Sequence, residues 1–391
     1  MKITDLDQLR ADTPACESLI HFNNAGASLM PKPVHQAVID HLALEASIGG
    51  YEAEHQTKTE LDALYTEFAT LLNASADEIA FIENATRAWD MAFYGMPLEE
   101  GDHILTHESE YVSNYLGFLQ QAKRRNLVID LIPSDEHGQI DVNAIPALIG
   151  DKTRLIAITH VPTQGGLVNP AVEVGAIAKA HNLIYLLDAC QSAGQIALDV
   201  KQIQCDVLTG TGRKFLRGPR GTGFLYVNKA FLDKLDPPFI DLHSATWTAD
   251  NAFEFAPTTR RFENWESYVA GRVGLMHAVR YANTIGLTNI EARVSDLAKT
   301  VRSKLSDIKA VDVHDLGIEK CGIVTLTKSG INASDLCAHL HAHGINTSIS
   351  TMTSARLDMG KRNLDTLVRA SVHYFNTEDE VDRFAQVVES A

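Results

Sequence analysis

Cysteine is scarce in this sequence, and the few cysteines do not follow the pattern of a metal site or a disulfide framework. The 391 residues hold five cysteines, which form no CxxC pair and have no clustered histidines beside them. Zinc knuckles need such clusters, and an odd, scattered set argues against a disulfide framework. We therefore expect no metal site, and small buried apolar side chains at Cys16, Cys190, Cys205, Cys321 and Cys337.

The sequence also lacks an excess of positive charge and any long apolar run. Asp and Glu outnumber Lys and Arg by 50 to 34, which gives a formal net charge of −16. Broad binding to nucleic acid or anionic lipid needs surplus cations, so we expect neither nucleic-acid nor membrane partners. The first twenty residues show no continuous apolar stretch like that of a signal peptide, and no later run reaches the length of a membrane span. The expectation is a cytoplasmic protein with a small-molecule substrate.

What the sequence does contain, between residues 79 and 228, is a regular alternation of short β-rich runs with helical patterns. This alternation predicts βα units and a mostly parallel sheet, whose ligand site lies at the carboxyl ends of the strands. Beyond residues 236–238 the pattern predicts a long helix over about 267–283 and then a smaller α+β unit. That unit is expected to hold a helix over 288–307, a strand over 322–327, a helix over 333–343 and a terminal helix from Thr377.

Residues suited to chemistry are concentrated in LLDACQSAGQ (186–195) and CDVLTGTGRKFLRGPRGTGFLYV (205–227). Asp188 ends an apolar strand at the ligand edge of the sheet, where a carboxylate needs a cationic partner such as a pyridinium nitrogen. In the second stretch, Gly210 and Gly212 let the backbone approach a ligand. Lys214 follows among arginines, which lower the pKa of an amine and so favour the neutral form that makes a Schiff base. Taken singly, these features are also those of a helix cap, a turn and a solvated face.

Together with motifs spread over most of the chain, these stretches resemble the class V aminotransferase family, which includes cysteine desulfurases, selenocysteine lyases and isopenicillin N epimerase-like proteins. The resemblance implies an α/β protein of pyridoxal 5'-phosphate (PLP) fold type I, with a mostly parallel seven-stranded sheet, that acts as a homodimer. We expect a large PLP-binding domain over residues 21–255 and a small α+β domain formed by residues 256–391 with residues 1–20. The further motifs are HFNNAGASLMPKPV (21–34), ENATRAWD (83–90), ESEYVSN (108–114), ITHVPTQGGLVNP (158–170) and VRASVHYFNTEDEVD (368–382).

The same resemblance assigns roles to single residues. Lys214 would form the internal aldimine with PLP, and Asp188 would pair with the pyridine nitrogen. Arg369 would clamp the α-carboxylate of an amino-acid substrate, a task that suits a planar bidentate donor, and Asn24 would be a second substrate-binding residue. Further cofactor contacts are expected from Ala85 and Thr86 at a phosphate-binding helix start, Gln191 at the phenolic oxygen, Thr211 at the phosphate, and Tyr111, Thr163 and Arg213.

Some positions depart from the desulfurase pattern. Tyr111 and Arg213 stand where desulfurases have histidine, and Thr163 stands where many members have asparagine. The loop 343–363 contains no cysteine, although persulfide-forming desulfurases hold their nucleophile in this region. The block GRKFLRGPRGTGFLYV is instead similar to the branch that holds isopenicillin N epimerase-like proteins and hercynylcysteine sulfoxide lyase.

The predicted function is therefore a lyase that cleaves the Cβ–S bond, or the bond to a similar β-substituent, of a cysteine-like amino acid without a persulfide cysteine. Elimination needs only Lys214 as a base. Aminotransferase or amino-acid epimerase activity on the same scaffold are alternatives. A catalytically silent PLP-fold binding protein is the alternative of another class.

Overall fold

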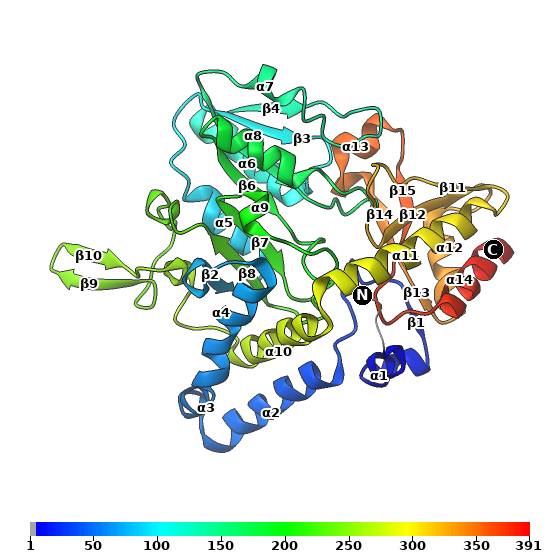
Figure 1. Ribbon diagram of the computed structural model, residues 1–391, viewed down its shortest axis with the longest axis horizontal. Helices are drawn as coiled ribbons and strands as arrows, with labels where there is room; N and C mark the ends of the chain where they lie inside the picture. Colours follow the sequence, from blue (N-terminus) through cyan, green and yellow to red (C-terminus); the bar gives the residue numbers. More distant parts are fainter. Residues whose placement is uncertain (1–4) are drawn as a thin grey trace.

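The computed structural model describes residues 5–391, and a seven-stranded sheet lies at its centre (Figure 1). The strand order is β2-β8-β7-β6-β5-β3-β4; β8 runs antiparallel to both of its neighbours and the other pairs are parallel. The prediction of a mostly parallel seven-stranded sheet is confirmed. The strands are β2 (Ile79–Ile82), β3 (His103–His107), β4 (Val128–Ile132), β5 (Thr153–Thr159), β6 (Ile184–Asp188), β7 (Val207–Thr211) and β8 (Gly223–Val227).

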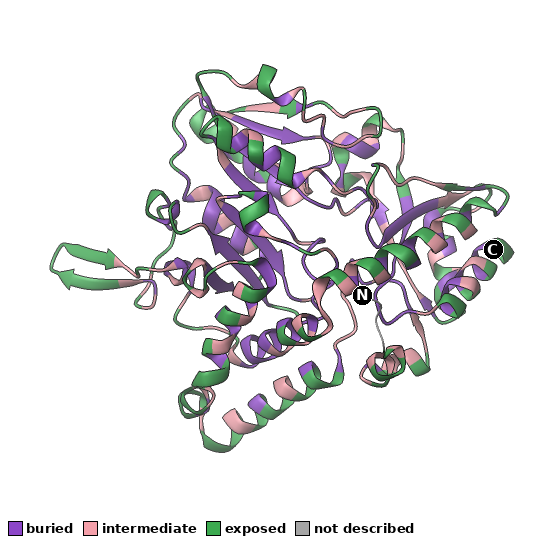
Figure 2. Ribbon diagram, viewed as in Figure 1, coloured by how far each residue is buried: buried purple, intermediate pink, exposed green. Residues whose placement is uncertain are grey.

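Helices cover both faces of this sheet, because successive side chains of a strand point to opposite faces and both sets are apolar. Leu186 of β6 packs in one core cluster with side chains of α5 and α6, and Leu187 packs in another with side chains of α4, α8 and α10. Figure 2 shows the strands buried beneath helices whose outer faces are exposed. The helices are α2 (Lys32–Ile48), α3 (Gly50–Gln56), α4 (Lys58–Leu72), α5 (Ala85–Tyr94), α6 (Val112–Arg125), α7 (Ile145–Leu148), α8 (Ala171–Ala180), α9 (Val200–Ile203) and α10 (Val269–Ile285).

The carboxyl-terminal part forms the smaller α+β unit that the sequence predicts. Its antiparallel sheet has the order β11-β12-β15-β14 and packs with α11, α12 and α14 around a third core cluster. Each predicted element lies within a few residues of its expected place. The elements are α11 (Leu287–Ser306), β11 (Val311–Val313), β12 (Ile323–Lys328), α12 (Ala333–Ala342), β13 (Ile345–Asn346), β14 (Ser348–Thr351), α13 (Arg356–Lys361), β15 (Thr366–Ser371) and α14 (Glu378–Ser390).

The amino-terminal segment contacts this smaller unit. It forms α1 (Leu6–Ala11) and β1 (Ile20–His21), and β1 pairs in parallel with β13. Arg10 forms an ion pair with Glu380 of α14 at 2.7 Å. The division of the chain at residue 255 stays a prediction, since α10 lies beyond that point and packs along α2 and α4 of the larger unit.

A hairpin projects from the body of the molecule at the left of Figure 1. It consists of β9 (Ala245–Ala249) and β10 (Ala252–Phe255), which pair antiparallel. Aromatic side chains are exposed on this arm, above all Trp247, which is 79% exposed, and Phe253. None of the helices within residues 5–391 is long and apolar enough to span a membrane.

Candidate active site

Three neighbouring strands of the large sheet end in polar side chains at the same edge. Thr159 closes β5, Asp188 closes β6 and Thr211 closes β7. Thr159 lies opposite Asp188 in the register of β5 and β6, and all three side chains are buried. Because parallel strands end at one edge, the sequence places these groups together, as expected for a ligand site in an α/β sheet.

Lys214 follows β7 and lines a cavity at this edge together with Asp188. The lysine side chain is buried, and burial lowers the pKa of its amine to about 8, with the Arg213 charge lowering it further against the opposing effect of Asp188. The expectation of a lowered lysine pKa is confirmed, but desolvation is its main cause and the neighbouring cation is secondary. A larger fraction of Lys214 is therefore neutral near neutral pH than of an ordinary lysine.

The loop that carries Lys214 is fastened by Arg217, a fully buried arginine with a positive φ of 61°. The Arg217 amide donates to the Lys214 carbonyl at 2.9 Å. Its guanidinium donates to the Leu29 carbonyl, the Tyr374 hydroxyl and the Thr13 hydroxyl at 2.8, 2.6 and 2.7 Å. The lysine loop is thus tied to segments near both ends of the chain.

The start of α5 forms one wall of the cavity. Ala85 and Thr86 lie in its first turn and line the cavity, while the N-cap residue Asn84 accepts a hydrogen bond from the Arg87 amide. A Cβ on Gly223 of β8 would lie 2.9 Å from the Ala85 nitrogen, so only glycine lets the helix start approach the strand this closely. Free N–H groups at a helix start favour an anion such as a phosphate.

Two further predicted residues lie beside this helix start. The Arg213 guanidinium donates to the Thr211 hydroxyl at 3.1 Å, and Arg213 lines the cavity. Gly210 and Gly212, expected to approach a ligand, are instead close to protein side chains: a Cβ would meet the Phe224 ring at the first and the Thr222 hydroxyl at the second. These glycines make room for Phe224 of β8 and for Thr222 just before it, and a close approach of their backbone to a ligand stays a prediction.

Arg369 enters the site from β15 of the smaller unit. Its guanidinium donates to the hydroxyl and carbonyl oxygens of Thr163, at 2.5 and 3.1 Å, and to the Ser348 hydroxyl at 3.1 Å. All of these acceptors are neutral. Burial lowers the pKa of Arg369 to about 10, with the Arg213 charge lowering it further against the opposing effect of Tyr111.

Thr163 connects Arg369 to the cavity that Lys214 lines. Its hydroxyl also accepts from the Gln191 side-chain nitrogen at 3.3 Å, while the other side-chain atom of Gln191, Oε1, is buried without a partner in the described chain. Tyr111, at the start of α6, lines the same cavity. The structure therefore brings these predicted residues together with Ala85, Thr86, Asp188, Arg213 and Lys214.

Asn24 does not line this cavity among the described residues. Its amide nitrogen donates to the His21 and Ser371 carbonyls at 3.2 and 2.7 Å, and its oxygen accepts from the Ser28 hydroxyl at 2.6 Å. These contacts tie the amino-terminal segment to β15. They favour a structural role, so substrate binding by Asn24 stays a prediction.

Cys190 lies two residues beyond Asp188, just after the end of β6. The chain turns there, and the Cys190 amide donates to the Asp188 carboxylate at 2.8 Å. Cys190 therefore lines the cavity with Lys214.

Sequence reasoning also missed Asn84, Asn114 and Thr159, which line the cavity. Each had a signal in the sequence. Asn84 precedes a helical pattern, as an N-cap does, and Thr159 ends an apolar strand as Asp188 does. Asn114 lies one helical turn after Tyr111 within ESEYVSN, so both lie on one side of α6.

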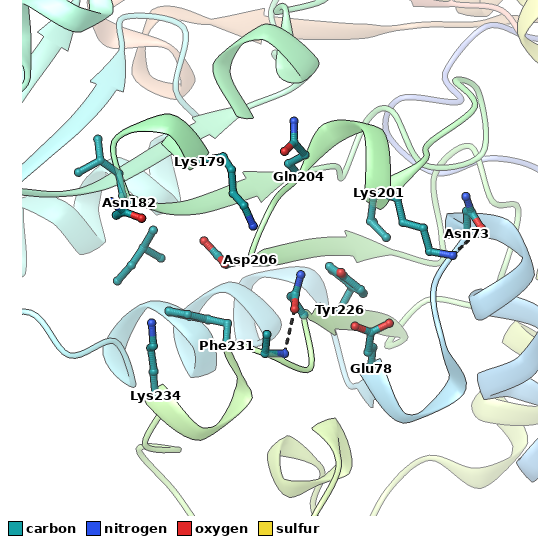
Figure 3. A pocket seen from close by; sticks show the side chains of 15 residues that line it. Asn73, Glu78, Lys179, Asn182, Lys201, Gln204, Asp206, Tyr226, Phe231 and Lys234 are labelled. Carbon is teal, nitrogen blue, oxygen red and sulfur yellow. Dashed lines mark hydrogen bonds between the residues drawn. The ribbon is translucent and has the colours of Figure 1, made fainter. Parts of the chain in front are cut away.

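A second cavity, of about 550 Å³, lies at the opposite edge of the large sheet, where β6 and β7 begin (Figure 3). Asp206, just before β7, and the lysines Lys179, Lys201 and Lys234 are among its lining residues. Lys214 lies at the other edge of the sheet, where the parallel strands end. The larger cavity is therefore separate from the strand-end site.

Comparison with known proteins agrees with this geometry. The family model described as Aminotransferase class-V matches residues 20–384, which is most of the chain. The chain belongs to the class V aminotransferase family. It is thus a PLP-dependent enzyme of fold type I.

Individual relatives of this class V chain cover nearly its whole length. A protein named probable cysteine desulfurase from Pyrococcus abyssi is 29% identical, over 98% of this chain and 96% of the relative. The solved structure of a cysteine desulfurase from Thermococcus onnurineus has a TM-score of 0.92 at 28% identity, covering 100% of this chain and 98% of that one. The cystine C–S lyase C-DES, solved in complex with its reaction product cysteine persulfide, has a TM-score of 0.87 at 22% identity, covering 96% and 99%.

The residues of this class V site fit PLP by their chemistry. Lys214 offers an amine of lowered pKa, Asp188 offers a buried carboxylate for a pyridinium nitrogen, and Gln191 has a buried polar atom without a partner. The first turn of α5 and the Thr211–Arg213 pair suit a phosphate. Arg369 lies beyond these groups, across Thr163, and its binding of a substrate carboxylate stays a prediction.

Arg369→Lys is expected to raise KM for amino acids about tenfold to hundredfold, the effect of losing one charged hydrogen bond of roughly 1.5–3 kcal/mol. An ammonium cannot reproduce a two-point contact with a carboxylate. The measurement is steady-state kinetics on the holoenzyme, with Arg293→Lys as control, since Arg293 pairs with Glu378 at 2.5 Å on the surface. An unchanged KM would show that the carboxylate binds elsewhere.

Proposed function

We propose that this PLP enzyme is a lyase that cleaves the Cβ–S bond, or the bond to a similar leaving group, of a cysteine-like amino acid, without using a persulfide cysteine. One observation carries the proposal: in the described chain, Cys190 is the cysteine that lines the cavity, and it lies in the turn beside Asp188, whereas the segment between β13 and α13 contains no cysteine. Burial raises the pKa of Cys190, and the Asp188 charge raises it further. A raised pKa disfavours the thiolate, which is the attacking species.

The other cysteines are no better placed to attack a substrate sulfur. Burial raises the pKa of each of them, and the loop between β13 and α13 contains no cysteine. The relatives that are named cysteine desulfurases therefore share the fold with this chain but do not establish its reaction. The similarity to C-DES supports C–S bond cleavage as a reaction of this scaffold.

The residues of the site have distinct tasks in such an elimination. Arg369 binds the α-carboxylate, and Lys214 takes the proton from the α-carbon onto its Nζ atom. Asp188 would stabilise the positive charge of the protonated pyridine nitrogen. PLP, when bound, supplies the electron sink for the bond broken at the α-carbon. The overall reaction consumes one water and releases a thiol, pyruvate and ammonium.

A variant with all five cysteines replaced by serine or alanine tests this proposal. We expect its turnover to stay within about tenfold of the wild type, which allows for roughly 1.4 kcal/mol of lost transition-state stabilisation. The assay is a panel of amino acids, with detection of pyruvate, sulfide, ammonia and newly formed amino acids. Formation of a new amino acid or inversion at the α-carbon would instead identify transamination or epimerisation.

Single reversion variants make this test sharper. If the cysteine-free protein is folded, loaded with PLP and inactive, restoring Cys190 alone identifies whether the thiol in the cavity is required. Restoring Cys205, which lies before β7 away from the cavity lining, is the matched control. A persulfide found by mass analysis on any of the five cysteines during turnover would contradict the proposal.

We also propose that the enzyme is a homodimer, as the family resemblance implies. The support is a set of exposed apolar side chains on the projecting β9–β10 hairpin and the segment before it. Monomeric proteins rarely expose apolar patches of this kind without a partner. The exposed side chains are Phe239, Ile240, Leu242, Trp247 and Phe253. A cytoplasmic location remains a prediction.

A further inference from the structure

A second carboxyl group lies buried beside Asp188. Glu110, between β3 and α6, is 5% exposed, and Asp188 is 4% exposed. The side-chain nitrogen of Asn114 joins them: it donates to Glu110 Oε1 at 2.8 Å and to Asp188 Oδ2 at 2.8 Å. One amide group thus bridges the two carboxyls beneath the cavity that Lys214 lines.

The other contacts of Glu110 are neutral groups from three surrounding elements. The Thr159 hydroxyl of β5 donates to Oε1 at 2.6 Å, and the Tyr111 amide at the start of α6 donates to the same oxygen at 3.1 Å. The Thr106 hydroxyl of β3 lies 3.3 Å from Oε2. The charge that acts on Glu110 is that of Asp188, which has the same sign.

The two carboxyls therefore differ in what balances their charge. Asp188 lies near Lys214 and is the partner for the pyridinium nitrogen of the cofactor. Glu110 is separated from both cations by Asp188 and the Asn114 side chain. Two like charges in one buried site cannot both form at low cost, so the carboxyl without a cation keeps its proton longer. Burial first, and then the Asp188 charge, raise the pKa of Glu110 to about 7, while its hydrogen bonds oppose the shift.

We propose that Glu110 is a positioning residue of the cofactor site, which holds a proton while Asp188 is charged and transmits its own ionisation through Asn114 and Asp188 to the pyridine nitrogen. This inference depends on the PLP site and not on which substrate bond is broken. When Glu110 loses its proton, the added negative charge makes the proton on the pyridine nitrogen harder to remove. When Glu110 is protonated, that nitrogen is held by Asp188 alone.

The test follows the pyridine nitrogen itself. Holoenzyme is reconstituted with PLP that carries ¹⁵N in the ring, and the ¹⁵N chemical shift is followed over pH without substrate. In the wild type we expect the pH dependence of the ¹⁵N chemical shift to contain a titration component near neutral pH. In Glu110→Gln, which keeps the side chain's size and remains neutral, we expect PLP to stay bound and this component to be lost.

Thr159→Val provides a second, directional measurement. The Thr159 hydroxyl stabilises the charged form of Glu110 and so lowers its pKa, so its removal should move the same component to higher pH. Asp206→Asn is the matched control, because burial also raises the pKa of Asp206 but this carboxyl lines the separate cavity of Figure 3. The control should leave the ¹⁵N profile as in the wild type.

Two outcomes would overturn the proposal. One is a ¹⁵N profile in Glu110→Gln that matches the wild type. The other is a shift to lower pH, or no shift, in Thr159→Val, which remains informative if Glu110→Gln fails to fold. Because no substrate is present, failure of the proposed lyase reaction would leave this result unaffected.

Discussion

Lys214→Ala is expected to abolish covalent attachment of PLP and to reduce turnover by at least about a hundredfold, the lower bound for removing a general base. Two properties of the residue lead to this expectation. Lys214 is the lysine that lines the strand-end cavity, and burial lowers the pKa of its amine to about 8, so that the neutral nucleophile is accessible near neutral pH.

The measurement for Lys214 is borohydride reduction of the holoenzyme, followed by peptide mass analysis. The pyridoxyl group should be found on Lys214 in the wild type and should be absent from the variant. Lys179→Ala is the control, since Lys179 lines the cavity at the opposite edge of the sheet and should leave labelling unchanged. Labelling of another lysine in the wild type would refute the assignment of the site.

Asp188→Asn is expected to retain PLP but to lower kcat by about a hundredfold to a thousandfold, a loss typical of removing one electrostatic contact to a reacting group. The asparagine keeps the shape of Asp188 and loses the charge that holds the pyridine nitrogen protonated. It also changes the hydrogen bonding, because Asp188 accepts from both the Cys190 amide and the Asn114 side chain. One of these donors would then face a second amide nitrogen.

The measurement for Asp188 combines cofactor content, from the absorption of bound PLP, with turnover of the best substrate. Asp206→Asn is again the control, because Asp206 is a half-buried carboxyl at the opposite edge of the same sheet. Activity of Asp188→Asn within a few-fold of the wild type would show that another group supports the ring nitrogen. Loss of PLP would point to a role in cofactor binding.

The sequence predicted the parts of the site that depend on strand order. Asp188 could be placed because a parallel sheet brings the ends of its strands to one edge, and the same rule applies to Thr159 and to Thr211, which was assigned from the family resemblance. The helices α2, α3 and α4 were not predicted, and neither was the packing of α2 and α4 along α10, which is distant in the sequence.

The sequence could not predict contacts that depend on where the chain leaves a strand. Cys190 lines the cavity with Lys214 from the turn that follows β6, where its amide donates to the Asp188 carboxylate. Glutamate side chains are usually exposed, and the burial of Glu110 depends on three elements that converge around it. Likewise, the contacts of Asn24 with Ser371 join positions that are 347 residues apart.

The contacts of Arg217 also bear on when the enzyme can mature during its synthesis. This residue fastens the loop of Lys214 to Thr13, 204 positions earlier, and to Tyr374, 157 positions later. Contacts of such long sequence separation form late in folding, because the chain between them must first be ordered. A growing chain therefore lacks the complete anchorage of its lysine until the segment that carries Tyr374 has been translated and docked.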